Sequence, residues 1–277
     1  MIIRRRTFIR FLIAAVAASL LPQWCTAAVD VSPAPLPRIA IRIGEHKGFI
    51  IKPSNPAADG TKPWLWYAPT IGGHPNLTNE WVFRPLVERG FAICGVDVGE
   101  SYGSPAGRKI FSDFYAHVRK EYGLDQRASF LAQSRGGLMV YNWAADAENI
   151  DKVCAIAAIY PVCDLRSYPG LDKAAPAYGM SAKELEIALK KHNPIDRLGW
   201  LAKAGVPIFH IHGDSDTVVP LEHNSQVIYD RYKALTGKMH LVVIKGKGHA
   251  EIPEFFQSQQ LVDFIANAKA SDVRNVD

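Results

Sequence analysis

A repeated alternation between short apolar runs and segments with helical spacing constrains the fold of this chain more than any other feature of its sequence. The apolar runs cover residues 64–68, 91–97, 129–132, 153–160, 206–212 and 240–244, and the helical segments cover 80–89, 110–121, 138–147, 221–235 and 253–269. Runs that are apolar at nearly every position are typical of strands buried on both faces. Strands that alternate with helices predict an α/β fold, in which helices cover both faces of a mostly parallel sheet.

Two shorter runs with alternating polarity, residues 38–43 and 48–52, come first and predict a hairpin at the edge of the sheet. They bring the number of expected strands to eight. Residues 165–198 interrupt the alternation, being rich in Pro, Gly and Ala with one amphipathic helix at 181–191, and we expect a small helical cap over the carboxyl ends of the strands. That interval is too short for a second domain, so residues 29–277 are predicted to form a single domain.

Residues 1–28 are predicted to be a signal peptide rather than part of the fold. Four arginines precede an apolar run, which Pro22 interrupts before the roughly 20 residues that a membrane span needs. The pair Arg5 and Arg6, followed by an apolar pair and a cation, resembles a twin-arginine signal, and a general secretory signal is the alternative. Bulky residues before Cys25 argue against a lipoprotein anchor, so we expect an exported protein, periplasmic or secreted, without a stable membrane anchor.

The charge balance argues against nucleic acid as a partner. The whole chain carries a formal charge of +5, but the predicted signal holds four of its 32 basic residues and none of its 27 acidic ones, which leaves about +1. Nucleic-acid and anionic-membrane partners require clustered cations, and the chain has no long charge run. The sequence does not indicate an oligomeric state.

The segment from Ala132 to Gly137 lies between a predicted buried strand and a predicted helix, and it has the outline of a nucleophile elbow with Ser134 at the turn. In such an elbow the serine hydroxyl is exposed at the top of the sheet, so the residues two before and two after it must be small. Here those residues are Ala132 and Gly136, and alanine takes the place of the usual first glycine. A strand-to-helix turn with a capping serine is the alternative interpretation.

Two further segments follow late strands and supply a carboxylate and a histidine. Residues 212–220 contain Asp214 and Asp216, and we favour Asp216 as the acid, because Asp214 lies in the turn itself and is suited to capping local amides. His249 stands after the last strand and before the last helix, and it is predicted to be the base. The order nucleophile, acid, base along the chain is that of the α/β-hydrolase fold rather than that of the chymotrypsin or subtilisin folds.

These residue types suit hydrolysis through an acyl-enzyme. A serine hydroxyl is a weak nucleophile at neutral pH, so His249 is expected to accept its proton while the aspartate fixes the tautomer of the histidine. The developing oxyanion needs hydrogen-bond donors. We expect one from the backbone amide of Arg135 and a second from the loop 70–73, where Ile71 and Gly72 are the favoured candidates.

The elbow, the segment 212–220 and the pair Gly248 and His249 together resemble the α/β-hydrolase superfamily, and more narrowly its prolyl oligopeptidase and secreted esterase branches. The likeness extends over the chain from residue 40 onward and implies the α/β-hydrolase fold with a serine triad, but it leaves the substrate open. Arg135, directly after Ser134, is also similar to the Ser-Arg elbow of glucuronoyl esterases, whose arginine helps to stabilise the oxyanion.

Several residues near these motifs are candidate substrate contacts. The guanidinium of Arg135 has three interpretations: it assists the oxyanion, it binds a substrate carboxylate or sugar hydroxyl, or it forms an ion pair with a neighbouring acidic residue. Glu100 and Tyr102 lie in a loop that borders the pocket in this fold, and a solvated turn is the alternative. His74, beside a glycine pair, is a candidate for the acyl site or an ordinary loop residue.

His210 and His212 alternate along a predicted strand with Asp214 beyond them, a pattern that invites a metal interpretation. A buried, hydrogen-bonded histidine is the commoner state in a strand, and no fourth ligand has suitable spacing. We therefore predict neither a metal nor another cofactor.

The function predicted from these features is that of an exported serine hydrolase, which cleaves carboxylic esters of carbohydrates or small molecules. A peptidase of the prolyl oligopeptidase type shares the mechanism, but the chain has no long propeller domain to exclude folded proteins. An amidase or thioesterase would use the same triad. A non-catalytic binding protein of hydrolase fold is the rival from another class, and the presence of all three triad residues argues against it.

Overall fold

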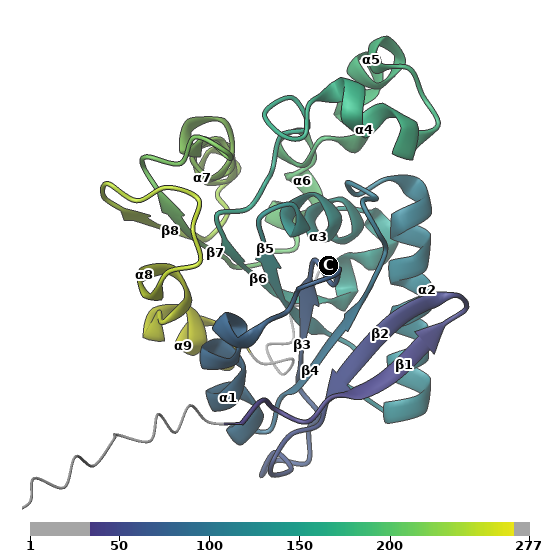
Figure 1. Ribbon diagram of the computed structural model, residues 1–277, viewed down its shortest axis with the longest axis vertical. Helices are drawn as coiled ribbons and strands as arrows, with labels where there is room; N and C mark the ends of the chain where they lie inside the picture. The colour runs from purple at the N-terminus through teal and green to yellow at the C-terminus, as the bar shows by residue number, and fades with distance from the viewer. Residues whose placement is uncertain (1–33, 269–277) are drawn as a thin grey trace, which may run out of the picture. The chain divides into compact units, whose positions relative to one another are not determined.

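A computed structural model describes residues 34–268 of the chain (Figure 1). The predicted signal peptide over residues 1–28 lies outside the described residues. Among the helices of the described part, none combines the length and apolarity that crossing a membrane requires.

The centre of the fold is a sheet of eight strands in the order β1-β2-β4-β3-β5-β6-β7-β8. The strands are β1 (Ile39–Ile43), β2 (His46–Ile51), β3 (Trp64–Ala68), β4 (Ala92–Val96), β5 (Ala128–Gln133), β6 (Val153–Ile159), β7 (Ile208–Gly213) and β8 (Met239–Ile244). The hairpin of β1 and β2 pairs antiparallel and joins β4 in the same sense, whereas all the other neighbours pair in parallel. This confirms the prediction of a mostly parallel, eight-stranded α/β sheet with a hairpin at its edge.

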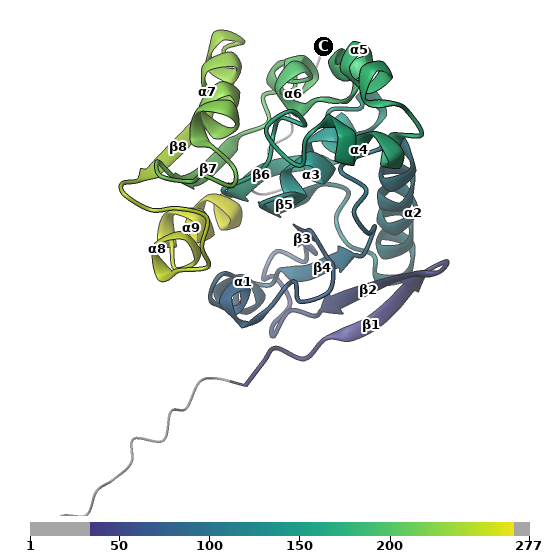
Figure 2. The same ribbon diagram turned by 45° about the horizontal axis from the view of Figure 1, so that its top comes forward.

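Helices cover both faces of this sheet (Figure 2). They are α1 (Glu80–Glu88), α2 (Pro105–Tyr122), α3 (Gly136–Ala144), α4 (Leu171–Tyr178), α5 (Ala182–His192), α6 (Gly199–Lys203), α7 (Ser225–Ala234), α8 (Pro253–Phe256) and α9 (Gln259–Asn267). One hydrophobic core joins α2, α3, α6 and α7 to the sheet, and a second joins α1, α8 and α9 to the opposite face. Alternate residues of β3 supply the two cores, as the period of two in a strand requires.

The core under α2 and α3 is aromatic. The ring of Trp66, fully buried in β3, lies 4.8 to 5.2 Å from the rings of Phe111, Phe114, Phe130 and Trp143, measured between centroids. Rings at these separations add edge and stacking attraction to the burial of their area. The cluster therefore holds both helices against β3 and β5, the strand that leads into Ser134.

Several element boundaries differ from those expected. Helix α2 begins five residues before the apolar periodicity, because Ser104 caps it and a proline occupies its first position. The expected single helix over 253–269 is two helices, α8 and α9, and the side chain of Ser258 caps the second. Strand β8 was expected to be buried on both faces but is half exposed, because it is the last strand of the sheet.

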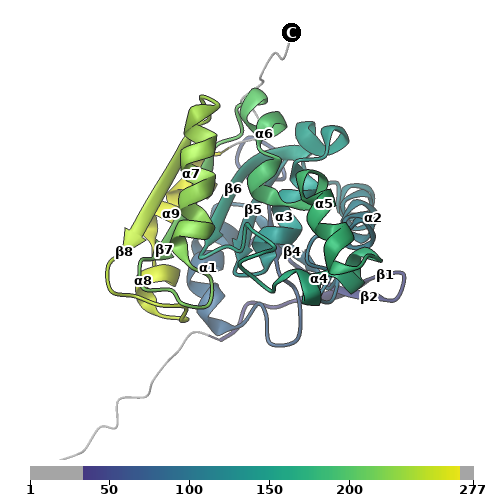
Figure 3. The same cartoon turned by 90° about the horizontal axis from the view of Figure 1, so that it is seen from above.

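Residues 165–198 contain two helices, α4 and α5, where the sequence predicted one. In the view from above, both lie on the same side of the molecule as α2 (Figure 3). The Asn193 side chain closes the base of this segment, accepting from the Leu165 amide at 2.9 Å and donating to Asp164 at 2.8 Å. The Tyr178 hydroxyl donates to the carbonyl of Tyr102 at 2.7 Å, so α4 rests on the loop after β4.

Candidate active site

Ser134 stands at a sharp turn between β5 and α3. Its φ of +50° lies in the left-handed region, a conformation that costs a non-glycine residue about 1–3 kcal/mol and is concentrated at functional sites. The turn is closed by backbone hydrogen bonds from Gly137 and Val162 to the carbonyl of Ser134, at 3.0 and 2.8 Å. A Cβ on Gly136 would lie 2.1 Å from the carbonyl oxygen of Ala68, which explains why the elbow requires a glycine there.

Gly136→Ala is therefore expected to lower the free energy of unfolding by about 1–3 kcal/mol, because a main-chain carbonyl cannot move aside as a flexible side chain can. Urea denaturation would measure the loss. Gly199→Ala is the matched control, since nothing lies within 4 Å of the Cβ it would add and alanine is the better helix former. Equal stability of the two variants would contradict the close packing at the elbow.

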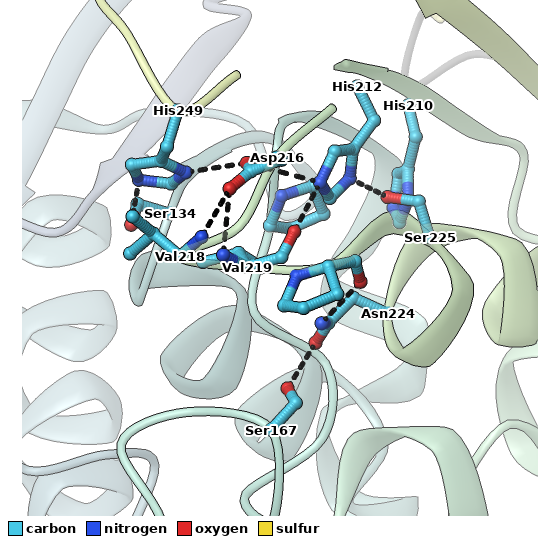
Figure 4. Close-up of polar contacts among 12 residues, drawn as sticks. Ser134, Ser167, His210, His212, Asp216, Val218, Val219, Asn224, Ser225 and His249 are labelled. Atoms are coloured by element: carbon cyan, nitrogen blue, oxygen red, sulfur yellow. Dashed lines mark hydrogen bonds and ion pairs between the residues drawn. The ribbon is translucent and has the colours of Figure 1, made fainter. Parts of the chain in front are cut away.

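The structure brings Ser134, His249 and Asp216 together from three loops (Figure 4). The Ser134 Oγ lies 3.0 Å from the His249 Nε2, and the His249 Nδ1 lies 2.8 Å from the Asp216 Oδ2. A carboxylate can only accept, so Nδ1 carries the proton and Nε2 is free to accept from the serine hydroxyl. This arrangement has the geometry of a nucleophile, a base and an orienting acid.

Asp216 is 5 % exposed and is held as a carboxylate by its hydrogen bonds. Its Oδ1 accepts from the amides of Val218 at 2.9 Å and Val219 at 2.8 Å. Burial raises the pKa of Asp216, but the hydrogen bonds from His212, His249 and the Val219 amide outweigh burial, so the pKa lies well below its usual range.

Asp214, the other aspartate of this loop, is exposed and accepts from the amide of Gly246 and the hydroxyl of Ser215. It caps the turn, in agreement with the reason for preferring Asp216.

The two predicted oxyanion-hole elements lie at a helix N-terminus and at a turn. Arg135 directly precedes α3, where backbone amides have no partner within the helix. In the loop 70–73, the Ile71 amide donates to the carbonyl of His74 at 3.3 Å, and the His74 amide donates back at 2.8 Å. This bridge engages the amide of Ile71 but not that of Gly72.

Arg135 forms an ion pair with Glu100, which joins the residue after Ser134 to the loop after β4. Of its three interpretations, the ion pair is the one seen in the structure. Tyr102 lies beside the pair, and burial together with the Glu100 carboxylate raises the pKa of its phenol. Three of the four candidate substrate contacts, Arg135, Glu100 and Tyr102, thus form one cluster, and their roles toward a substrate stay predictions.

Glu251, which sequence reasoning missed, connects the strand end before Ser134 and the loop after β3 to the loop that carries His249. Its carboxylate accepts from Gln133, the residue before the nucleophile, at 2.9 Å and from Asn76 at 2.8 Å. The Nδ1 of His74 lies 3.5 Å from the same carboxylate, so this candidate belongs to the Glu251 cluster. The available signal was Gln133 itself, a polar residue at the end of a largely apolar strand, which must find partners when buried.

The ring of Tyr160 was missed as well. It lies 4.3 Å from the imidazole of His249 between centroids, and the residue has a positive φ at the end of β6. The ring is buried and packs on Phe255 and Phe256, so it provides an apolar wall behind the histidine. Nothing in the sequence around residue 160 marks it, because the contact depends on β6 and the loop after β8 meeting in space.

His210 and His212 are fully buried and hydrogen-bonded. The His210 Nε2 lies 2.7 Å from the Tyr141 hydroxyl, and the Nδ1 atoms of both histidines lie within 2.9 Å of the Ser225 hydroxyl. Within residues 34–268, no group of three or more His, Cys, Asp or Glu side chains is arranged to hold a metal ion. Burial, with a smaller contribution from His212, lowers the pKa of His210 to about 3.

The neutral His210 makes stability depend on pH. An unfolded histidine titrates near about 6.5, whereas the folded His210 titrates at about 3. Between these values the unfolded chain binds a proton that the native state excludes. The stability contributed by His210 is therefore complete above the unfolded pKa and is lost, by about 1.4 kcal/mol per pH unit, as the pH falls.

Urea denaturation of the wild type and of His210→Phe across this pH window measures the effect. The variant is expected to be less stable at neutral pH, because it removes the partner of Tyr141, but to lose less stability on acidification. Identical slopes would contradict a neutral, buried His210.

The chain resembles known proteins both in part of its sequence and in its fold. The family model of the Phospholipase/Carboxylesterase family matches residues 199–268, the quarter of the chain that carries Asp216 and His249. A search of curated protein sequences found no match. Many solved structures share the fold, and three of them are 15% to 19% identical to this chain in sequence.

An acylaminoacyl peptidase from Pyrococcus horikoshii is 19% identical with a TM-score of 0.63, and the match covers 87% of this chain and 42% of that one. A puromycin-hydrolyzing peptidase of Mycobacterium tuberculosis is 15% identical with a TM-score of 0.59, over 82% of this chain and 38% of that one. Est1E from Butyrivibrio proteoclasticus is 17% identical with a TM-score of 0.60, over 83% of this chain and 98% of that one. The chain thus spans less than half of the two peptidases and nearly all of Est1E. Its sheet topology and these likenesses identify it as a protein of the α/β-hydrolase fold.

Proposed function

We propose that this protein is a serine hydrolase that cleaves carboxylic esters through an acyl-enzyme. The observation that carries the proposal is the hydrogen-bonded series from the Ser134 Oγ through His249 to Asp216, with distances of 3.0 and 2.8 Å. The Ser134 Oγ attacks the acyl carbon as its proton passes to the His249 Nε2, and the imidazolium then gives this proton to the leaving alcohol. Water then attacks the acyl-enzyme as its proton passes to His249, which releases the acid and restores Ser134.

The oxyanion is proposed to bind at the N-terminus of α3. The Arg135 amide is the first donor, because amides at a helix N-terminus point outward and lie at the positive end of the helix dipole. For the second donor the loop 70–73 supplies the candidates Ile71 and Gly72. The bridge to His74 already engages the Ile71 amide, which favours Gly72.

Two comparisons support an ester rather than a peptide as substrate. The matching family model is that of phospholipases and carboxylesterases. Est1E, a structural neighbour, is covered over nearly its whole length, whereas less than half of each of the two peptidases is covered. A peptidase is the second candidate, favoured by the higher TM-score of the acylaminoacyl peptidase. We propose small-molecule or carbohydrate esters as substrates. A shared fold by itself does not identify the acyl group.

Fluorophosphonate labelling of the purified chain tests the nucleophile, and a substrate panel tests the reaction. The panel pairs p-nitrophenyl esters with p-nitroanilides of acylated and free amino acids. Covalent labelling with ester turnover well above anilide turnover is expected. Anilide turnover equal to or above that of the esters would favour the peptidase, and an unlabelled, folded protein would exclude a serine hydrolase.

Export is part of the proposal and rests on the sequence alone. The predicted signal over residues 1–28 carries the pair Arg5 and Arg6. The protein is expected outside the cytoplasm in fractionated cells. Lysine at both positions should block export by a twin-arginine route, whereas a general secretory route tolerates the change. Retention of the unaltered chain in the cytoplasm would contradict export.

A further inference from the structure

A continuous series of buried hydrogen bonds runs behind the aspartate of the site (Figure 4). His212 lies at the carboxyl end of β7, four residues before Asp216, and is fully buried. Its Nε2 lies 2.8 Å from the Val219 carbonyl and 3.4 Å from the Asp216 Oδ2. Both of these groups can only accept, so the Nε2 of His212 carries a proton and donates toward them.

The partners beyond His212 can be hydrogen-bonded in one consistent direction with Nε2 as the donor. When the Nδ1 of His212 accepts a hydrogen bond from the Ser225 hydroxyl at 2.8 Å, Ser225 accepts in turn from the His210 Nδ1 at 2.9 Å. The His210 Nε2 then accepts from Tyr141 at 2.7 Å. In this direction every donor in the series has an acceptor.

His212 also shapes the loop that surrounds the carboxylate. The Val219 carbonyl accepts from His212, while the Val219 amide donates to the Asp216 Oδ1 at 2.8 Å. One residue later, the Pro220 carbonyl accepts from the Asn224 side chain at 2.9 Å, and Asn224 in turn accepts from the Ser167 hydroxyl at 3.1 Å. Removing the His212 donor would free the segment that presents both amides to Asp216.

We propose that His212 is a positioning residue of the hydrolase: its Nε2–H holds the Asp216 carboxylate and the Val219 carbonyl in place, so that Asp216 faces His249 when Ser134 attacks. This inference rests on the proposed function. His212 touches neither the substrate nor the reacting atoms, and its effect passes through Asp216 and His249. It should therefore act on the rate of the covalent step rather than on the binding of the acyl group.

The test compares His212→Phe, which keeps an aromatic ring but has no donor, with His212→Gln, which restores an N–H at the end of the side chain. Tyr232→Phe is the matched control for lost stability. Its hydroxyl is buried in α7 and donates to the Val206 carbonyl at 2.6 Å, so both substitutions to phenylalanine leave a buried carbonyl without this donor. Inactivation by a fluorophosphonate gives the maximal rate of inactivation and the half-saturating probe concentration separately.

His212→Phe is expected to lower the maximal inactivation rate by about 10- to 100-fold with little change in half-saturation, because small displacements of a catalytic group are costly. His212→Gln should recover part of the rate, and Tyr232→Phe should melt earlier yet react like the wild type. A wild-type rate in His212→Phe, or an equal loss in Tyr232→Phe, would overturn the inference.

Proton NMR provides a second readout that does not need turnover. The strongly deshielded proton shared by His249 and Asp216 should be visible in the wild type and lost or shifted in His212→Phe, with partial return in His212→Gln. An unchanged resonance in His212→Phe would overturn the positioning role.

An unlabelled wild type would contradict the proposed function alone, and the NMR comparison would still decide the role of His212. If His212→Phe does not fold, His212→Gln against Tyr232→Phe makes the same comparison.

Discussion

Replacing Ser134 by alanine is expected to lower kcat for a p-nitrophenyl ester by roughly 10⁶-fold and to abolish fluorophosphonate labelling. The Ser134 Oγ, 3.0 Å from the His249 Nε2, is the atom that forms the acyl bond in the proposed mechanism. Without it, His249 can at most activate water, and the remaining acceleration comes from substrate binding and the oxyanion donors. Active-site titration and steady-state kinetics measure the two effects.

Ser215→Ala is the matched control for this substitution. Ser215 is exposed and donates to Asp214 in the turn before the acid, so the variant loses a hydroxyl without touching the nucleophile. It should label and turn over like the wild type. Residual labelling of Ser134→Ala at the wild-type rate would assign the nucleophile to another residue.

Asp216→Asn is expected to lower kcat by about 10⁴-fold while leaving the fold intact. The amide of asparagine is nearly the same size as the carboxylate, and its oxygen can still accept from the Val218 and Val219 amides. Its NH₂ group then faces the His249 Nδ1, which must accept, so the proton moves to Nε2 and the imidazole can no longer accept from Ser134. Esterase kinetics together with circular dichroism separate this loss from unfolding.

Asp214→Asn is the control, because Asp214 lies in the same loop but is exposed and caps the turn through Gly246. It should keep nearly all of the activity. A greater loss in Asp214→Asn than in Asp216→Asn would reverse the assignment of the acid, the choice that the sequence pattern left between two aspartates.

The sheet and the positions of its strands were predictable, because local sequence carries the relevant signal. A strand buried on both faces must be apolar throughout, and a covering helix must be apolar on one side, so burial leaves its period in the sequence. The errors fall where local signals compete. Ser104 and Pro105 start α2 before its apolar stripe begins, and α4, with its internal proline, escaped prediction.

The candidate triad could be predicted for a related reason. In a parallel sheet every strand presents its carboxyl end at the same edge, so residues in the loops after strands β5, β7 and β8 come near one another wherever they stand in the sequence. The choice of Asp216 over Asp214 also followed from local turn chemistry. Substrate contacts had no such constraint, and only the structure identified Glu100 as the acidic residue that pairs with Arg135.

The sequence by itself determined the α/β sheet, the elbow at Ser134 and the order of nucleophile, acid and base, because each depends on a local pattern that strand or turn geometry demands. Only the tertiary structure decided the partners of the buried polar groups. Glu251 meets Gln133 across 118 residues, and Tyr141 meets His210 across 69. A hydrogen bond between such residues depends on the packing of whole strands and helices, and no local period or motif in the sequence records it.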